Sequence, residues 1–266
     1  MKLARNIQDN FDYLPTLNNM GYMSPSLDQI QLAFVNQSKE NSSGQFLDIG
    51  CGFGVATLPL IDEGCHVIAC DLDVRHLEIL NGKIPAEKKS LITLKQGHFP
   101  NKICFPENSI DYINLSMVLH FLPPVVIRKT FVTIFKILKG GGKLFLTTSS
   151  PYQAPLSSFL PTYESKRNLY EWPGYIADIA QYVPQRAHLL PKMNIVFCIN
   201  ELKRLATKFG FYVLDATFFS RIGIPDDLRL DGREYSGIIC EKPRDVSVIF
   251  LEKNKAAPPM QAANIK

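Results

Sequence analysis

Short apolar runs alternate with amphipathic segments along the first half of the chain. Apolar runs of about five residues, followed by turn-forming or acidic residues, are typical of strands buried in a parallel sheet. We expect such strands at 45–49, 66–70, 91–95, 110–115 and 143–148. The segments between them repeat apolar residues at intervals of three and four, which is typical of helices. This alternation predicts an α/β fold with a mainly parallel sheet.

Capping and helix-breaking residues set the expected ends of the helices. Serine, aspartate and asparagine side chains accept hydrogen bonds from the first backbone N–H groups of a helix, and proline is tolerated in its first turn. We expect helices after Ser26, over 55–61, over 74–80 between Asp73 and Asn81-Gly82, from Pro124 to Leu138 before the glycines at 140–142, and over 201–209 after Asn200.

The second half of the chain departs from this alternation between 149 and 192. This insert is rich in proline and aromatic residues and has no clean period, so we interpret it as a stiff lid over a substrate pocket. The alternative is a small additional core beneath a long loop. Two closing strands are expected at 211–219 and 235–241. We divide the chain into an N-terminal cap segment (1–43), one domain (44–245) that includes the insert, and a polar tail (246–266) that we expect to be flexible.

Composition excludes several classes of protein. The 266 residues are 46% hydrophobic and 20% charged, the balance of a globular protein with a substantial core. The net charge of +4 is too small to predict nucleic-acid binding, and no apolar run is long enough to span a membrane. The first residues contain no apolar core of a signal peptide, and the six cysteines have no metal-ligand spacing. We therefore expect reduced thiols, no metal site and a cytoplasmic location.

The glycine-rich stretch after the first expected strand contains the clearest chemistry. Gly50, Gly52 and Gly54 follow the apolar run at alternate positions, and a helix is expected next. Glycines permit a tight turn and let a ligand lie against the backbone. A dinucleotide fingerprint needs glycine where this chain has Val55, and the Gly-Lys-Ser/Thr of a phosphate-binding Walker loop is absent. A glycine-rich turn without a ligand is the alternative.

The run 46–54 resembles the D/E-x-G-x-G-x-G signature of the class I S-adenosylmethionine (SAM) dependent methyltransferases. Further motifs of that family follow in order, at Gly97-His98, 105–111, 119–122, 138–144 and 197–211. The resemblance covers roughly 45–148 and 195–240. It implies a doubly wound, seven-stranded, mainly parallel Rossmann-like sheet whose last strand is antiparallel, and an enzyme that uses SAM and releases S-adenosylhomocysteine (SAH).

The resemblance also implies which residues bind the cofactor. Asp71 follows the second expected strand, 17 positions after Gly54, where the family places the carboxylate that binds both ribose hydroxyls. His98 stands where the family usually has an aspartate that accepts from the adenine amino group, and a neutral imidazole nitrogen can accept the same bond. The full set of expected cofactor-binding residues is Asp48, Gly50, Cys51, Gly52, Gly54, Asp71, Leu72, His98, Phe99 and Ser116.

Catalytic and substrate residues are harder to assign from the residues. His120 follows the fourth expected strand and is the candidate general base, with a purely structural packing role as the alternative. Tyr22, Tyr152, Trp172 and Tyr175 are candidate substrate-pocket residues, and Tyr13 with Tyr22 is expected to close over the cofactor.

Three functions remain open at the level of sequence. The first is methylation of an O, N or C atom of a small molecule. The second is methylation of a protein docked through 246–266, and the third is a non-catalytic partner subunit with the SAM-binding fold. Methylation of a nucleic-acid base is disfavoured because Asn114 is followed by Leu115-Ser116-Met117 rather than by the Pro-Pro-Tyr/Phe motif of such enzymes.

Overall fold

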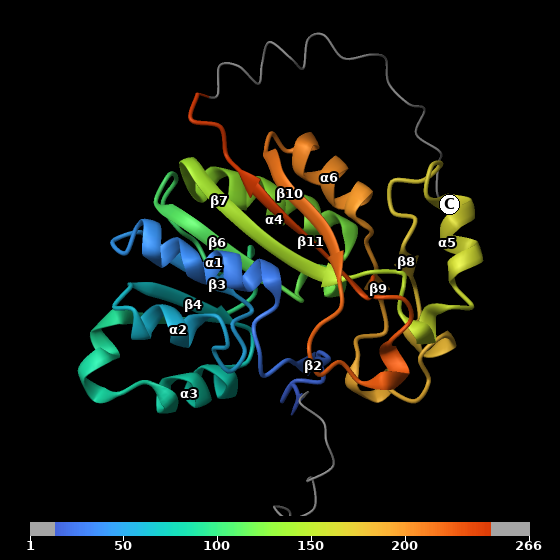
Figure 1. Ribbon diagram of the computed structural model, residues 1–266, viewed down its shortest axis with the longest axis horizontal. Coiled ribbons are helices and arrows are strands. Elements are labelled where there is room, and N and C mark those ends of the chain that lie inside the picture. Colours follow the sequence, from blue (N-terminus) through green and yellow to red (C-terminus); the bar gives the residue numbers. More distant parts are fainter. Residues whose placement is uncertain (1–13, 246–266) are drawn as a thin grey trace, which may run out of the picture.

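A seven-stranded sheet forms the centre of the computed structural model, which describes residues 14–245 (Figure 1). Its strand order is β10-β11-β7-β6-β3-β4-β5. The strands are β3 (Phe46–Ile49), β4 (Val67–Asp71), β5 (Ile92–Gln96), β6 (Ile110–Ser116), β7 (Leu138–Ser149), β10 (Tyr212–Phe219) and β11 (Tyr235–Glu241). All neighbours pair in parallel except β11, which is antiparallel to both β7 and β10. The expected mainly parallel sheet with an antiparallel last strand is confirmed.

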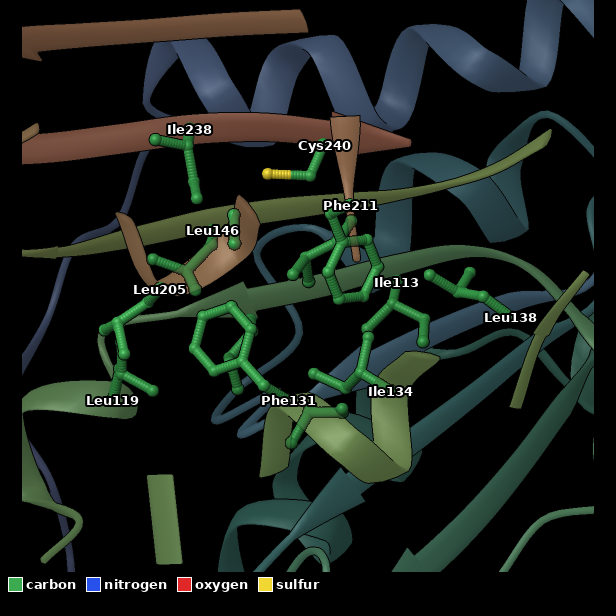
Figure 2. Packing of buried hydrophobic residues seen from close by; sticks show 14 of the residues in the cluster. Ile113, Leu119, Phe131, Ile134, Leu138, Leu146, Leu205, Phe211, Ile238 and Cys240 are labelled. Atoms are coloured by element: carbon green, nitrogen blue, oxygen red, sulfur yellow. The ribbon is translucent and has the colours of Figure 1, made fainter. Parts of the chain in front are cut away.

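Helices cover both faces of the sheet and bury two apolar clusters. The helices are α1 (Gln29–Glu40), α2 (Thr57–Asp62), α3 (Val74–Lys83), α4 (Pro124–Ile137), α5 (Leu160–Lys166) and α6 (Ile199–Lys208). Residues of α1, α2 and α3 share one cluster with β3 and β4, while α4 and α6 pack in the other. In Figure 2, Phe131 of α4 lies near Leu205 of α6, below Leu146 and Ile238 of the sheet, and Ile134 lies near Ile113.

Two helix starts differ from expectation because a different residue caps each helix. Asp28, not Ser26, caps α1: its side chain accepts from the N–H groups of Ile30 and Gln31, and the Gln31 side chain accepts from the Asp28 N–H. Cys198, not Asn200, precedes α6, because the Glu201 carboxylate accepts from the Cys198 N–H at 2.7 Å. A glutamate or glutamine that reaches back to the cap decides both boundaries.

Two helix ends also differ from expectation, because glycine does not end either helix. α3 continues through Asn81-Gly82 to Lys83, and its last turn is followed by Ile84 in extended conformation before Pro85. A residue before proline is disfavoured in the helical region, so the proline ends this helix. The glycines at 140–142 lie within β7, since α4 ends at Ile137 and the strand begins directly after it.

The insert 149–192 contributes a third, separate apolar cluster. Tyr152, Leu156, Phe159 and Tyr163 pack there with Ile176 and Ile179. The insert contains α5, and β8 (Tyr175–Ile176) pairs with β9 (Asn194–Ile195) just beyond it. This packing matches the alternative of a small additional core beneath a long loop. The lid function of the insert stays a prediction.

A short N-terminal segment, 14–24, which we call the strap, lies beside the carboxyl ends of the strands. It contains the hairpin of β1 (Leu14–Pro15) and β2 (Tyr22–Met23). Tyr13 and the tail 246–266 are outside the described residues. Among residues 14–245, no helix combines the length and the apolar character needed to cross a membrane.

Candidate functional site

A cleft of ≈ 390 Å³ opens at the carboxyl ends of β3, β4 and β6. In parallel α/β sheets this edge is where ligands bind. Nine of the ten residues expected to bind the cofactor line the cleft: Asp48, Gly50, Cys51, Gly52, Asp71, Leu72, His98, Phe99 and Ser116. The residues implied by the resemblance therefore come together at one cleft from four separate turns of the chain.

Gly54 is the exception among the expected cofactor-binding residues. Its φ of +86° favours glycine, and a Cβ there would lie 2.3 Å from Leu80 Cδ1 of α3. Gly54 does not line the cleft, so its role is close packing of the turn against α3. That Gly54 binds the cofactor stays a prediction.

Gly50 and Gly52 form the floor of the cleft. Both have positive φ, +73° and +52°, and a Cβ at Gly50 would lie 2.3 Å from Val118 Cγ2. The N–H groups of Gly50 and Cys51 donate to the Cys70 carbonyl at 2.8 and 3.0 Å, which ties the turn to the end of β4. Any larger side chain at these positions would fill space that a ligand needs.

Asp71, the last residue of β4, organises the neighbouring wall. Its carboxylate accepts from the backbone N–H groups of Gly52 and Asp73, each at 2.9 Å, and from His76 Nδ1 at 3.0 Å. His76 Nε2 accepts from the Leu17 N–H at 3.1 Å, so the ring proton is assigned to Nδ1. The carboxylate thus links the glycine turn, α3 and the strap.

His76 was not predicted from the sequence. It is 2% exposed and lies in the first turn of α3, five positions after Asp71. A histidine in the turn after an acidic strand end was the only available signal. Its second partner, Leu17, is 59 positions away and could not be predicted.

A polar group centred on Asp48 lies beneath the glycine turn. Asp48 is 1% exposed, and its two carboxylate oxygens accept from Asn114 Nδ2 at 2.8 Å and from Thr57 Oγ1 at 2.7 Å. Burial raises the pKa of Asp48. Asn114 Oδ1 is buried, has no hydrogen-bond partner within 14–245, and belongs to a residue that lines the cleft. Because an unpaired buried acceptor is costly, this oxygen fits a ligand that brings a donor such as an ammonium group.

The cleft wall holds no reactive thiol and no metal site. Burial raises the pKa of the Cys51 thiol well above its ordinary value, so this cysteine stays neutral and is a poor nucleophile. Within the described part of the chain, no group of three or more His, Cys, Asp or Glu side chains could hold a metal ion.

A second cavity of ≈ 110 Å³ adjoins the cleft on the side of the insert. Five residues line both spaces and form their shared boundary: Met20, Tyr22, Met117, Phe121 and Arg221. Most of the second cavity's wall is apolar, with residues from the strap, the insert and β11. A concave, mostly apolar wall with a few polar groups is typical of a small-molecule site.

Of the four expected substrate-pocket residues, the structure places only Tyr22 at these cavities. Tyr152 is 8% exposed and its hydroxyl donates to Glu164 at 3.2 Å. Trp172 packs edge-on against Phe197, and Tyr175 is 43% exposed on β8. Neither cavity is lined by these three aromatic residues. Their packing roles were hidden because the insert has no periodic pattern.

His120 lines the second cavity but not the cleft. It is 4% exposed, lies against Phe121 with ring centroids 3.9 Å apart, and its Nδ1 is 3.3 Å from Thr148 Oγ1. Burial, with a smaller contribution from the positive charge of Arg221, lowers its pKa to about 3. An imidazole with this pKa is neutral near pH 7 and is a weak base.

Arg221, at the boundary of the two cavities, was not predicted from the sequence. Its guanidinium donates to Asp28 Oδ2 at 2.6 Å and to Ser116 Oγ at 3.1 Å, and lies 4.8 Å from the centre of the Tyr235 ring. It follows β10 in a segment without a recognisable motif, so no sequence signal marked it.

Part of the chain is similar to known methyltransferases. Residues 46–142 match the family model described as a methyltransferase domain. Phosphoethanolamine N-methyltransferase 2 of Caenorhabditis elegans is 31% identical over 169 residues, which are 60% of this chain and 37% of that protein. The chain therefore spans little more than a third of that relative's length.

Solved structures extend the likeness to most of the chain. A SAM-dependent methyltransferase of Methanosarcina mazei superposes with a TM-score of 0.61 at 18% identity, covering 83% of this chain and 100% of that one. A glycopeptide N-methyltransferase complexed with SAM gives a TM-score of 0.53 at 17% identity, covering 80% of this chain and 87% of that one. These likenesses establish a shared fold. Residues 46–142, which run from β3 into β7 and include the strands that build the cleft, therefore belong to the methyltransferase domain family, and the chain has the fold of the SAM-dependent methyltransferases among these structures.

Proposed function

We propose that this protein transfers the methyl group of SAM to a small organic molecule. The observation that carries the proposal is the pair of adjoining cavities: a cleft with residues that suit SAM shares five lining residues with a smaller, mainly apolar cavity. A compact cavity lined by apolar side chains with a few polar groups is typical of a small-molecule site. The free thiols of all six cysteines suit a reducing compartment such as the cytoplasm.

Several residues of the cleft fit the parts of SAM. Asp71 lines the cleft, and we expect its carboxylate to accept from the ribose hydroxyls, whereas Asn114 Oδ1, an acceptor without a partner within 14–245, suits the ammonium group. Leu72 and Phe99 provide apolar surfaces for the adenine ring. When bound, SAM supplies a methyl group that is activated by a positively charged sulfur. The acceptor's lone pair attacks the methyl carbon as the carbon–sulfur bond breaks, and SAH is released.

The chain's own contribution to this reaction is positioning and exclusion of water. Alignment of two reactants contributes a large part of many rate enhancements, and methyl transfer from a sulfonium needs little further activation. Because burial lowers the pKa of His120 to about 3, its imidazole has little affinity for a proton, and we propose that it shapes the second cavity rather than acting as a general base. The nucleophilic atom of the acceptor then has a lone pair that is available without removal of a proton by His120.

Calorimetry with SAH, SAM and NAD tests the cofactor site. We expect SAM and SAH to bind and NAD not to bind. Gly52→Arg should abolish SAH binding, because the side chain would enter the cleft beside Met23 Sδ, which already lies 2.5 Å from the position of a Cβ. Gly82→Arg is the matched control, because Gly82 is exposed on α3 with open space around it. Binding of NAD without binding of either SAM or SAH would refute the proposal.

A labelled methyl group tests the acceptor class. The protein is incubated with methyl-labelled SAM and a cell extract, which is then separated into small molecules, proteins and nucleic acids. We expect label to accumulate among the small molecules and to disappear with Gly52→Arg. Label confined to proteins or nucleic acids would contradict the proposal, and SAH binding without transfer to any fraction would favour the non-catalytic partner subunit.

A further inference from the structure

The second cavity is lined by two arginines. Arg186, from the insert, and Arg221, which follows β10, both line it. The cavity is only ≈ 110 Å³, so an occupant lies close to both guanidinium groups. None of the residues that line it is aspartate or glutamate.

Each arginine is paired with a carboxylate that lies outside the cavity. Arg186 donates through Nε and Nη2 to both oxygens of Asp227, at 2.6 to 3.0 Å, and Arg221 donates to Asp28. Neither aspartate lines the cavity. Each ion pair is therefore a dipole whose positive end is at the cavity wall and whose negative end is behind it.

Arg186 is held in place by contacts that fix its orientation. Its side chain is 13% exposed, and the guanidinium carbon lies 5.1 Å from the centre of the Tyr22 ring. The bidentate pair with Asp227 uses Nε and Nη2, so Nη1 is not required for that pair. A guanidinium fixed in this way presents a preorganised donor to an anion.

The two arginines occupy different depths relative to the cofactor cleft. Arg186 lines the second cavity alone, whereas Arg221 lines both spaces and contacts Ser116 at the end of β6. A molecule in the second cavity therefore lies beside Arg186, and Arg221 stands where this cavity adjoins the cleft.

We propose that the methyl acceptor is an organic anion whose charged group is bound by Arg186 and whose nucleophilic atom lies at the boundary beside Arg221. The inference rests on the proposed function, since it assigns the second cavity to the acceptor. A cationic acceptor would meet two guanidinium groups and no carboxylate, which makes its binding unfavourable. The apolar remainder of the wall requires an apolar body on the anion.

Three probes of the same skeleton test the charge preference by calorimetry on the protein saturated with SAH. They are phenylacetate, phenylacetamide and 2-phenylethylamine, which are anionic, neutral and cationic near pH 7. We expect phenylacetate to bind about tenfold more tightly than phenylacetamide, as for one charge-assisted hydrogen bond, and 2-phenylethylamine to bind most weakly. Arg186→Gln should bring the first two affinities to within about twofold of each other.

Arg167→Gln is the matched control, because Arg167 also pairs with a nearby carboxylate, Glu164, but lines neither cavity. It should leave the tenfold preference unchanged. Equal or tighter binding of 2-phenylethylamine, no binding of phenylacetate at millimolar concentration, or an unchanged preference in Arg186→Gln would each overturn the inference. Binding of SAH to the same samples separates the two proposals: its loss refutes the cofactor site, while its retention without an anion preference refutes only the acceptor class.

Discussion

Asp71 and His76 show what a single residue needs in order to be predicted. Asp71 was predicted because its position follows from local order: a strand, an acidic end, and a neighbouring glycine turn in a parallel sheet. His76 has an equally central place, between Asp71 and the strap, but one of its two ring hydrogen bonds is with Leu17. A role that depends on a distant backbone N–H leaves no local pattern in the sequence.

His120 is the residue whose ionisation gives a prediction about stability. In the folded protein its pKa is lowered to about 3, below the ordinary 6.5. Between these values the unfolded chain takes up a proton that the folded chain does not, so the free energy of unfolding falls as the pH falls. We expect His120 to contribute a slope of about 1.4 kcal/mol per pH unit in this window and none above it.

Urea unfolding of the natural protein and of His120→Gln between about pH 6 and about pH 4.5 measures this contribution. The variant keeps a side chain that can hydrogen-bond Thr148 but cannot ionise. The stability difference between the two proteins should shift in favour of the variant by about 1.4 kcal/mol for each unit of acidification. Parallel stability curves over this range would show that the imidazole is not buried in its neutral form.

At the level of elements, the strands were predicted better than the ends of the helices. Each core strand lies within one or two residues of its expected start or end, except β7, which begins five residues early. Apolar runs buried on both faces are a direct signal of strands. Helix ends depend instead on which side chain reaches which backbone N–H. The helices begin after Asp28 and Cys198, rather than after Ser26 and Asn200, because a side chain three residues further on accepts from the N–H of each.

The course of α3 through Gly82 predicts a stabilising substitution. Gly82 is inside the helix, is exposed, and a Cβ there would have no atom within 4 Å. Alanine loses less conformational entropy than glycine in a helix. We expect Gly82→Ala to raise the free energy of unfolding by about 0.5 to 1 kcal/mol, measured by urea unfolding.

Gly64→Ala provides the opposite case. Gly64 also has open space around it, but its φ is +81°, which strains alanine. We expect this variant to lower the free energy of unfolding by about 1 kcal/mol. A change in the same direction for both variants would show that added bulk, rather than backbone conformation, decides the outcome.

On the scale of the whole molecule, the sequence predicted the sheet and the cleft but not the arrangement of the strap and the insert beside them. The motifs lie in the repeated strand–helix units, whose order follows from topology. The strap and the insert have no period, and their roles come from contacts between them. The Gly21 N–H donates to the Leu189 carbonyl at 2.7 Å, and Tyr22 of the strap lies against Arg186 of the insert. The sequence therefore could not show which aromatic residues of the insert face a cavity and which pack in its own core.

The contacts of the strap predict that cofactor binding stabilises the strap. Asp71, His76 and the Leu17 N–H form a continuous chain of hydrogen bonds from the cleft to the strap, and Arg75 also donates to the Leu17 carbonyl. A ligand bound to Asp71 beneath the strap adds contacts that are lost when the strap opens. SAH should therefore stabilise the closed strap.

Hydrogen exchange followed by mass spectrometry measures this effect. We expect SAH to slow exchange in 14–24 by at least about tenfold, the factor that corresponds to about 1.4 kcal/mol of added protection. Exchange in the rest of the cleft should also become slower. His76→Gln should weaken the protection of the strap, because the Leu17 N–H loses its imidazole acceptor, whereas His66→Gln, at an exposed position outside the cleft, should not. The contrary result is protection by SAH in the rest of the cleft with exchange in 14–24 unchanged. It would mean that the strap closes independently of the cofactor, and that Asp71 and His76 stabilise only the fold around α3.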